Sequence, residues 1–110
     1  MKTVTIPLAS LLGNRADDLE IARQIRIMLL MPVFCLIEEY ADADFEGVEE
    51  VELDFTGISY ATTAFIHELF REPLREYGTW IFGYITYKHP TRNVRATICK
   101  AFETILDKGN

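Results

Sequence analysis

The pattern of apolar and polar residues is clearest in the middle of the chain. Residues 51–55 alternate apolar with acidic side chains, which is the period of a strand with one apolar face. Gly57 follows in a turn, and either Thr62 or Thr63 offers a hydroxyl oxygen that can cap the backbone N–H groups of a helix. Apolar residues from Phe65 onward have helical spacing. This stretch predicts a buried strand, a glycine turn and a helix, around which the other elements pack.

The N-terminal part of the chain predicts one strand and one helix. Thr3 to Leu8 alternate as a short strand, and residues 9–14 are expected to form a loop. A helix is expected from Asp17, with Arg23 and Arg26 on a flank that faces water. The inward stripe of this helix is predicted to consist of Leu19, Ala22, Ile25 and Leu29.

Pro32 interrupts the predicted helix. Proline removes a backbone hydrogen bond and crowds the carbonyl four residues earlier, so we expect a kink or a break between Leu29 and Val33. The run from Ile27 to Ile37 is apolar around most of the helix circumference. Deep burial explains such a run, and a surface for self-association or for a partner is the alternative. The apolar face that continues beyond the proline is predicted to consist of Val33, Leu36, Ile37 and Tyr40.

The C-terminal part predicts a long helix and a third strand. The helix from about Thr62 is expected to run to Tyr77, where Gly78 is a natural terminator. Pro73 lies inside this helix, which therefore bends or restarts there. Residues 80–85 are predicted to be a strand that is apolar on both faces.

A last helix completes an alternation of strands and helices. Thr91 or Asn93 is its expected cap. The order strand, helix, strand, helix, strand, helix predicts an α/β fold, with a small, mainly parallel sheet and packed helices, in one domain over residues 1–110. The inward residues of the last helix are predicted to be Val94, Ile98, Ala101, Phe102 and Ile105.

Composition and charge exclude some classes of partner and indicate where the protein is found. The formal net charge is -6 and the sequence pI is about 4.8, which disfavours nucleic acid and anionic membranes as partners. The chain enters a strand-like pattern at once, so no signal peptide is expected, and its longest apolar run is shorter than the roughly 20 residues of a spanning helix. Cys35 and Cys99 are interpreted as small core residues in a reducing compartment. We therefore expect a cytoplasmic, soluble protein.

Signatures of catalysis are absent from the sequence. It has no phosphate loop of the Walker type, no Gly-x-Gly-x-x-Gly and no Gly-x-Ser-x-Gly elbow. His67 and His89 have no partner at metal-ligand spacing, and His67 is expected to be a surface or core residue of its helix. We predict no catalytic residue, no metal and no cofactor, and hence no enzyme.

The central motif resembles a known family. Leu53-Asp54-Phe55-x-Gly57-Ile58, followed by Phe65-x-x-Glu68-Leu69, is similar to the motif of the STAS-like domains, a bacterial branch related to the anti-sigma-factor antagonists. The similarity extends upstream through Gly13-Asn14-Arg15 and Ile25-Arg26, and downstream through Tyr77-Gly78. It implies a STAS-like fold. It also implies a regulatory protein-interaction module in signalling, which docks on a partner such as a histidine-kinase-like ATPase or an anti-sigma-type factor.

The end of the central strand and the start of the next helix form the candidate site. Parallel sheets present ligand crevices at the carboxyl ends of their strands, and a helix start attracts anions, although simple capping explains the threonines equally well. The candidates for binding a partner or an anion are Asp54, Thr56, Gly57, Ser59, Thr62 and Thr63.

The resemblance also bears on phosphorylation at this helix start. It places the phosphorylated serine of the antagonists at Ala64, which has no hydroxyl. Thr63 and Thr62 are the nearest substitutes, but one step along a helix turns a side chain by about 100°. This departure argues against a phosphorylation switch.

Uneven charge leaves further alternatives open. Nine acids and no Lys or Arg lie between Glu38 and Asp54, where a solvated loop and a docking face for a basic partner are the two interpretations. Besides the regulatory module, we consider a small-ligand or nucleotide sensor at residues 54–63, and a homodimer or larger homo-oligomer built on residues 27–37. A second uneven region is a basic cluster, which is interpreted as solvated helix surface, as a site of head-to-tail or partner docking, or as an anion pocket. It consists of Lys88, His89, Arg92, Arg95 and Lys100.

Overall fold

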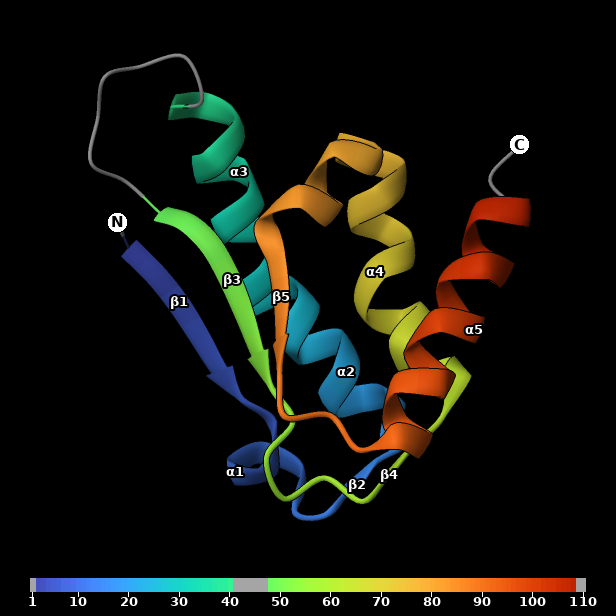
Figure 1. The fold of residues 1–110 in the computed structure, drawn as a ribbon. Coiled ribbons are helices and arrows are strands. Elements are labelled where there is room, and N and C mark those ends of the chain that lie inside the picture. Colours follow the sequence, from blue (N-terminus) through green and yellow to red (C-terminus); the bar gives the residue numbers. More distant parts are fainter. Residues whose placement is uncertain (1, 41–47, 109–110) are drawn as a thin grey trace.

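The computed structural model of this chain describes residues 2–40 and 48–108. Strands and helices alternate along the chain (Figure 1). In order, the elements are β1 (Lys2–Pro7), α1 (Leu8–Leu12), β2 (Arg15–Ala16), α2 (Leu19–Ile25), the π-helical turn η1 (Arg26–Leu30), α3 (Met31–Tyr40), β3 (Val48–Asp54), β4 (Tyr60–Ala61), α4 (Thr63–Tyr77), the 3₁₀ helix η2 (Thr79–Tyr84), β5 (Ile85–Lys88) and α5 (Arg92–Lys108).

A three-stranded parallel sheet supports the fold. Its strand order is β1-β3-β5, which places β3 in the centre (Figure 1). Ile6 pairs with Leu53, which pairs on its other side with Tyr87, and these apolar residues belong to or pack against the core. On the opposite face of the sheet, the hydroxyl of Thr5 donates to a carboxylate oxygen of Glu52 at 3.2 Å. The predicted α/β fold, with a small parallel sheet and packed helices, is confirmed.

One hydrophobic cluster joins α3, β3, α4 and α5. The inward face predicted for α5 is confirmed, because four of its five members are buried and Phe102 is half-buried. Thr91 is the cap of α5, since its Oγ1 accepts the N–H of Val94 at 3.2 Å. The centre of the cluster contains four fully buried aromatic residues, namely Phe34, Phe55, Phe65 and Phe70.

The segment before β2 differs from the prediction. Residues 9–14, expected to be a loop, lie mostly in the short helix α1. Leu8 is fully buried at its start, and Gly13 ends the helix with a φ of 76°, a conformation that glycine adopts without strain. A single turn of helix is too short to give a recognisable apolar period.

The predicted strand over residues 80–85 is also wrong. Thr79–Tyr84 forms η2, and β5 begins only at Ile85. The register pairs β5 with Val51–Asp54, so the sheet contact starts after the aromatic residues. The rings of Trp80 and Tyr84 instead pack edge to face, with centroids 5.6 Å apart, which is a favourable geometry for aromatic pairs.

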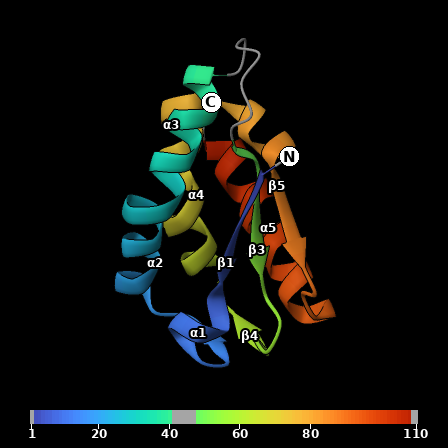
Figure 2. The same ribbon diagram turned by 90° about the vertical axis from the view of Figure 1, so that its left-hand side faces the viewer.

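α2, η1 and α3 form one continuous helical rod along one side of the molecule (Figure 2). The N–H of Met31 donates to the carbonyl of Arg26, five residues earlier, so η1 contains one residue more than an ordinary turn. Pro32 is the second residue after this turn. An irregularity was expected between Leu29 and Val33, and the structure places it at Arg26–Leu30.

The extra residue changes which side chains face inward. Ala22 and Ile25 are buried as predicted, but Leu19 is 47% and Leu29 is 37% exposed. Leu30 takes the inward position instead and is fully buried. Ile25 and Leu30 are five residues apart, which is the spacing of a π turn. The predicted stripe assumed an ordinary α-helical period and is therefore wrong at Leu29; it is also wrong at Leu19, which precedes the π turn.

Several side chains predicted to be buried are exposed. Leu36 of α3 is 45% exposed, whereas Val33 and Ile37 are buried as expected, and the side chain of Tyr40 lies outside the described residues. Cys35 and Cys99 are both exposed free thiols, so their interpretation as core residues is wrong. They lie on outward faces of α3 and α5, which the apolar character of their neighbours did not reveal.

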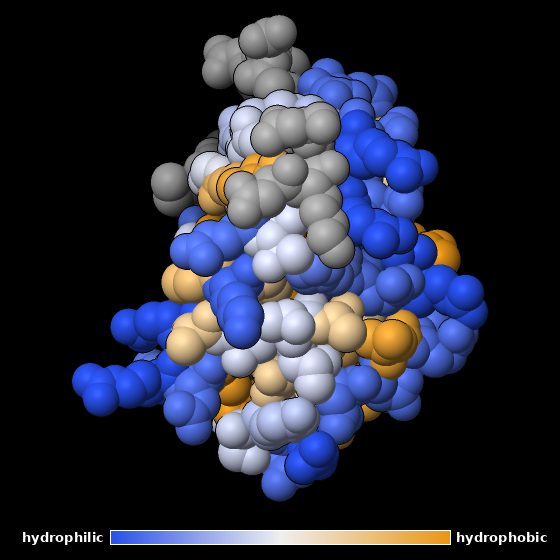
Figure 3. All heavy atoms as spheres, turned by 90° about the vertical axis from the view of Figure 1, so that its right-hand side faces the viewer, coloured by the Kyte–Doolittle hydropathy of each residue, from blue (hydrophilic) through white to orange (hydrophobic). Residues whose placement is uncertain are grey.

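The long helix α4 agrees with the prediction. It begins after Thr62 and continues through the buried Pro73 without a restart. Gly78 ends it with a φ of 101°. The face of the molecule that carries α5 is largely hydrophilic, with small separate apolar patches (Figure 3). Over residues 2–40 and 48–108, no helix combines the length and the apolar character needed to cross a bilayer.

Candidate partner-binding surface at the start of α4

The turn after β3 is held by its own residues. Oδ1 of Asp54 accepts the N–H of Thr56 at 2.9 Å. Gly57 has a φ of 88°, and a Cβ at this position would lie 3.4 Å from the Cβ of Ala9. Both the backbone conformation and the close approach of α1 therefore favour glycine here.

Asp54 has a structural part in this turn. The side chain of Thr56, followed by its backbone N–H, lowers the pKa of the Asp54 carboxyl from its ordinary value of 3.8, because hydrogen bonds to a carboxylate favour its charged form. Lys88 and His89 lower this pKa further by their charge. Lys88 is also the residue that pairs with Asp54 between β3 and β5. Asp54 is thus an anionic group at the carboxyl end of the sheet, with its hydrogen bonds directed to Thr56.

A short second ladder ties the candidate segment to the N-terminal part of the chain. β2 and β4 pair in parallel, with Arg15 opposite Tyr60, and the guanidinium carbon of Arg15 lies 4.3 Å from the centroid of the Tyr60 ring. Ser59 donates its N–H and its hydroxyl to the carbonyl of Asn14, at 2.9 and 3.2 Å. The sequence analysis missed this ladder, because strands of two residues show no period.

The start of α4 is capped by Thr62. Its Oγ1 accepts the N–H of Phe65 at 3.1 Å, which satisfies one of the backbone donors left free at a helix start. Thr63, the first helical residue, is half-buried, and Ala64 is exposed. Ala64, where the resemblance to the antagonists implies a phosphoacceptor, is thus exposed and lacks a hydroxyl, while the Thr62 oxygen serves as the cap.

The six candidates lie on one continuous segment at the carboxyl end of β3 (Figure 1). The side-chain hydrogen bonds of Asp54 and Thr62 are local, those of Ser59 reach back to Asn14, and none joins Asp54 to the threonines of α4. The structure therefore brings them together as a surface rather than as one convergent crevice. The exposed members are Thr56, Gly57 and Ser59, and the partly buried ones are Asp54, Thr62 and Thr63.

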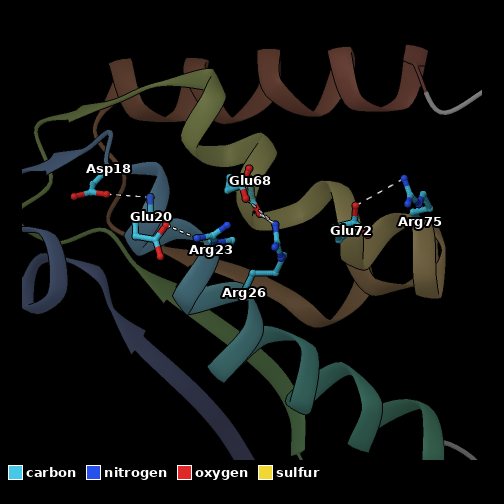
Figure 4. Close-up of polar contacts among 7 residues, drawn as sticks. All are labelled: Asp18, Glu20, Arg23, Arg26, Glu68, Glu72 and Arg75. Atoms are coloured by element: carbon cyan, nitrogen blue, oxygen red, sulfur yellow. Dashed lines mark hydrogen bonds and ion pairs between the residues drawn. The ribbon is translucent and has the colours of Figure 1, made fainter.

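A hollow that the sequence analysis missed lies between the rod and α4. Its volume is about 410 Å³. Arg26 bridges the two elements here, because it donates to Oε1 of Glu68 at 3.0 Å and to the backbone carbonyl of Glu68 at 2.9 Å (Figure 4). The side chain of Arg26 is only 14% exposed, so the expectation that it faces water is wrong. The hollow is lined by Arg23, Arg26, Ile27, Met31, His67, Glu68, Arg71 and Glu72.

His67 and Glu68 both line this hollow although they are neighbours on the helix. His67 is half-buried, and its Nε2 is buried without a hydrogen-bond partner among the residues that the structure describes. Figure 4 shows further ion pairs beside the hollow, Arg23 with Glu20 and Arg75 with Glu72. None of the six candidate residues belongs to its lining.

The basic cluster extends from the end of β5 along α5, and all five of its side chains are exposed. His89 has a φ of 51° in the turn between these elements. The acidic stretch is described only in part, because residues 41–47 lie outside the described residues. Within the described part of the chain, no group of three or more His, Cys, Asp or Glu side chains is placed to hold a metal ion.

Comparison with known proteins identifies the family. Searches of curated proteins and of solved structures found no match. The family model described as "STAS-like domain of unknown function (DUF4325)" matches residues 33–95. This region is more than half of the chain and includes β3, β4 and α4, which carry the candidate surface. The chain therefore belongs to the STAS-like domain family of unknown function.

Proposed function

We propose that this chain is a non-enzymatic regulatory module that docks on a signalling protein. Its docking surface consists of Thr56, Ser59, Tyr60, Thr63 and Ala64. A histidine-kinase-like ATPase or an anti-sigma-type factor is the partner class, because the resemblance to the anti-sigma-factor antagonists implies it. The observation that carries the proposal is that all of this surface except the half-buried Thr63 is exposed and yet fixed in place by the β2–β4 ladder and the Thr62 cap.

The aromatic residue at this surface supports the proposal. Tyr60 is 44% exposed, and Arg15 lies over its ring. Tyrosine and arginine are the residue types that most often dominate the energy of protein interfaces. Because both are held in a strand ladder, little conformational entropy is lost when a partner binds.

The surface is tested first by crosslinking in the cells of origin. A photo-crosslinking residue in place of Ser59 should capture the partner. The same residue in place of Thr86, which is exposed on the polar face of the sheet, should not capture it. Capture from Thr86 alone would overturn the proposed position of the surface.

The captured protein then allows a quantitative comparison of two matched variants. Ala64→Arg inserts a long charged side chain at the exposed start of α4, and Ala96→Arg makes the same change at an exposed position of α5. We expect Ala64→Arg to raise the Kd at least tenfold, which is about 1.4 kcal/mol, and Ala96→Arg to leave it unchanged. Equal affinity of both variants would contradict docking at this surface.

A sensor of small anions is the second candidate function, and the hollow beside α4 favours it. Three arginines and two glutamates line this hollow, which leaves a small positive excess in a protein of net charge -6, and its volume lies in the range of ligand sites. Inorganic phosphate and small dicarboxylates should then raise the melting temperature. Arg71→Gln should reduce this rise, whereas Arg75→Gln, outside the lining, should not. An unchanged melting temperature with every anion would exclude the sensor.

A further inference from the structure

The outer face of the rod formed by α2, η1 and α3 is apolar and exposed. The exposed fractions are 70% for Met28, 55% for Ile27, 45% for Leu36 and 37% for Leu29. Pro32 and Cys35 are exposed on the same rod. A cluster of large apolar side chains with charged residues at its ends is typical of an interaction surface.

These side chains do not contribute to the core of their own chain. The inward positions of the rod are already occupied by Ile25, Leu30, Phe34 and Ile37. The π turn makes this possible, because it keeps Ile25 and Leu30 inward at a spacing of five and leaves three consecutive apolar residues outside. A helix that is apolar on all sides is normally buried on all sides, so its outer face requires a contact in addition to the one with the core of its own chain.

The two ends of this face carry opposite charges. The face would therefore be complementary in charge to the same face of a second copy that runs in the opposite direction. Arg23 lies near the N-terminal end of the rod; it forms an ion pair with Glu20 on its own helix, and its side chain is still 51% exposed. Glu38 lies near the other end and is exposed. Arg23 and Met31 line the same hollow, and Glu38 follows Met31 by two helical turns, so these residues lie on one flank.

We propose that two copies of this chain associate through this face, with their rods antiparallel about a two-fold axis near Met31 and Pro32. Such an axis places Arg23 of each copy beside Glu38 of the other. It also brings Met28 against Cys35, and Leu29 against Leu36. A parallel arrangement would instead bring Arg23 against Arg23. An isologous contact of this kind closes at two subunits.

The contact goes beyond the proposed docking function, since it uses a different surface. It commits to a second copy because the face is self-complementary in both charge and apolar content. The Arg23–Glu38 contacts would also oppose the general repulsion between two molecules that each carry a net charge of -6.

Two leucines of nearly equal exposure provide a matched test. Leu36 is 45% and Leu106, on α5, is 43% exposed. By sedimentation equilibrium, Leu36→Glu should weaken the dimer about a hundredfold, because a charge replaces an apolar contact twice in the dimer. Leu106→Glu should leave the dimer unchanged. A native protein that stays monomeric up to about 100 µM would overturn the proposal.

Charge exchange tests the antiparallel register. Arg23→Glu and Glu38→Arg should each raise the dimer Kd by about tenfold, because each loses two ion pairs and gains like charges. The double variant should restore the native Kd, since the pairs re-form with reversed sign. Additive loss in the double variant would exclude this register.

Crosslinking gives an independent check of the register. In a Cys99→Ser background, Met28→Cys should form a disulfide with Cys35 of the second copy when diamide oxidises the two thiols. Replacing Cys35 by serine in that variant should abolish this product. Crosslinking that is equally efficient without Cys35 would mean that Met28 faces Met28, which contradicts the antiparallel pairing.

Discussion

Gly57 holds the turn after β3 in a conformation that other residues rarely adopt. With a φ of 88° and Ala9 close by, Gly57→Ala should lower the free energy of unfolding by about 1–2 kcal/mol. Gly83→Ala is the control, since a Cβ there meets open space, and it should change stability by less than about 0.5 kcal/mol. Urea denaturation of both variants measures the difference. Equal losses of stability in the two variants would show that alanine adopts the φ of Gly57 without a cost in free energy.

Asp54 should make stability depend on pH in the acid range. Its pKa is lowered in the folded state by Thr56, so its contribution is present above the unfolded pKa and is lost as the pH falls through the folded pKa. We therefore expect Asp54→Asn to be less stable than the native protein at pH 7. The gap between their urea midpoints should shrink by pH 3. A gap that is the same at both pH values would contradict this role.

Local chemistry made some residues of the site predictable. The cap could be narrowed to Thr62 or Thr63, and Gly57 could be identified as a turn residue, because a cap and a turn depend on neighbours within three residues. Arg15 and Tyr60 could not be identified, since their contact joins segments far apart in the sequence. The exposure of Cys35 was equally hidden, because it depends on which face of α3 meets the core.

The unit formed by β3, its turn and α4 depends on one buried ring. Phe65 is fully buried in the first turn of α4. Phe65→Ala should lower the free energy of unfolding by about 3–5 kcal/mol, because it removes a buried aromatic side chain and leaves a cavity. Phe82→Ala, which truncates a half-buried ring in η2, should cost clearly less. Thermal and urea unfolding distinguish the two, and similar losses would contradict the special position of Phe65.

The elements that were predicted correctly have long, clear periods. The alternation over residues 51–55 and the helical spacing in α4 and α5 are strong enough to identify each element. Residues 80–85 alternate too, but all of them are apolar or glycine, so the pattern does not distinguish a strand from a 3₁₀ helix. In the structure, β5 pairs only with Val51–Asp54 although β3 begins at Val48, and residues 79–84 form η2 instead.

The error at Leu29 has a different origin. The expected stripe was drawn with 3.6 residues per turn, and η1 contains an additional residue. Nothing in the local sequence marks this turn except Pro32 shortly after it. Packing against the core determines which residues of the rod point inward, because both Ile25 and Leu30 are buried there.

At the scale of the molecule, the sheet buries one face and leaves polar residues on the other. Parallel sheets are usually covered on both faces, but the far face here carries Thr5, Glu52 and Thr86 in adjacent strands. The order of the three strands was open from the sequence.

A single cluster of buried residues should make unfolding cooperative. It joins the rod, the sheet, α4 and α5. We expect far-ultraviolet circular dichroism, which reports on the helices, and the fluorescence of Trp80, which packs in η2 against Tyr77 and Tyr84, to give the same urea midpoint. Two separate midpoints would show that the chain comprises more than one folding unit.

The π turn has a consequence for how this family can vary. Removing one residue from η1 would reduce the separation of Ile25 and Leu30 from five to four, which is also a spacing that keeps two side chains on the same helix face. Ile25 and Leu30 would pack in the core with either spacing. The rod can therefore lose a single residue here while Ile25 and Leu30 both keep facing the core, and the side chains on its outer surface change position. We expect related chains to differ in length at this point, and to differ in their assembly when they do.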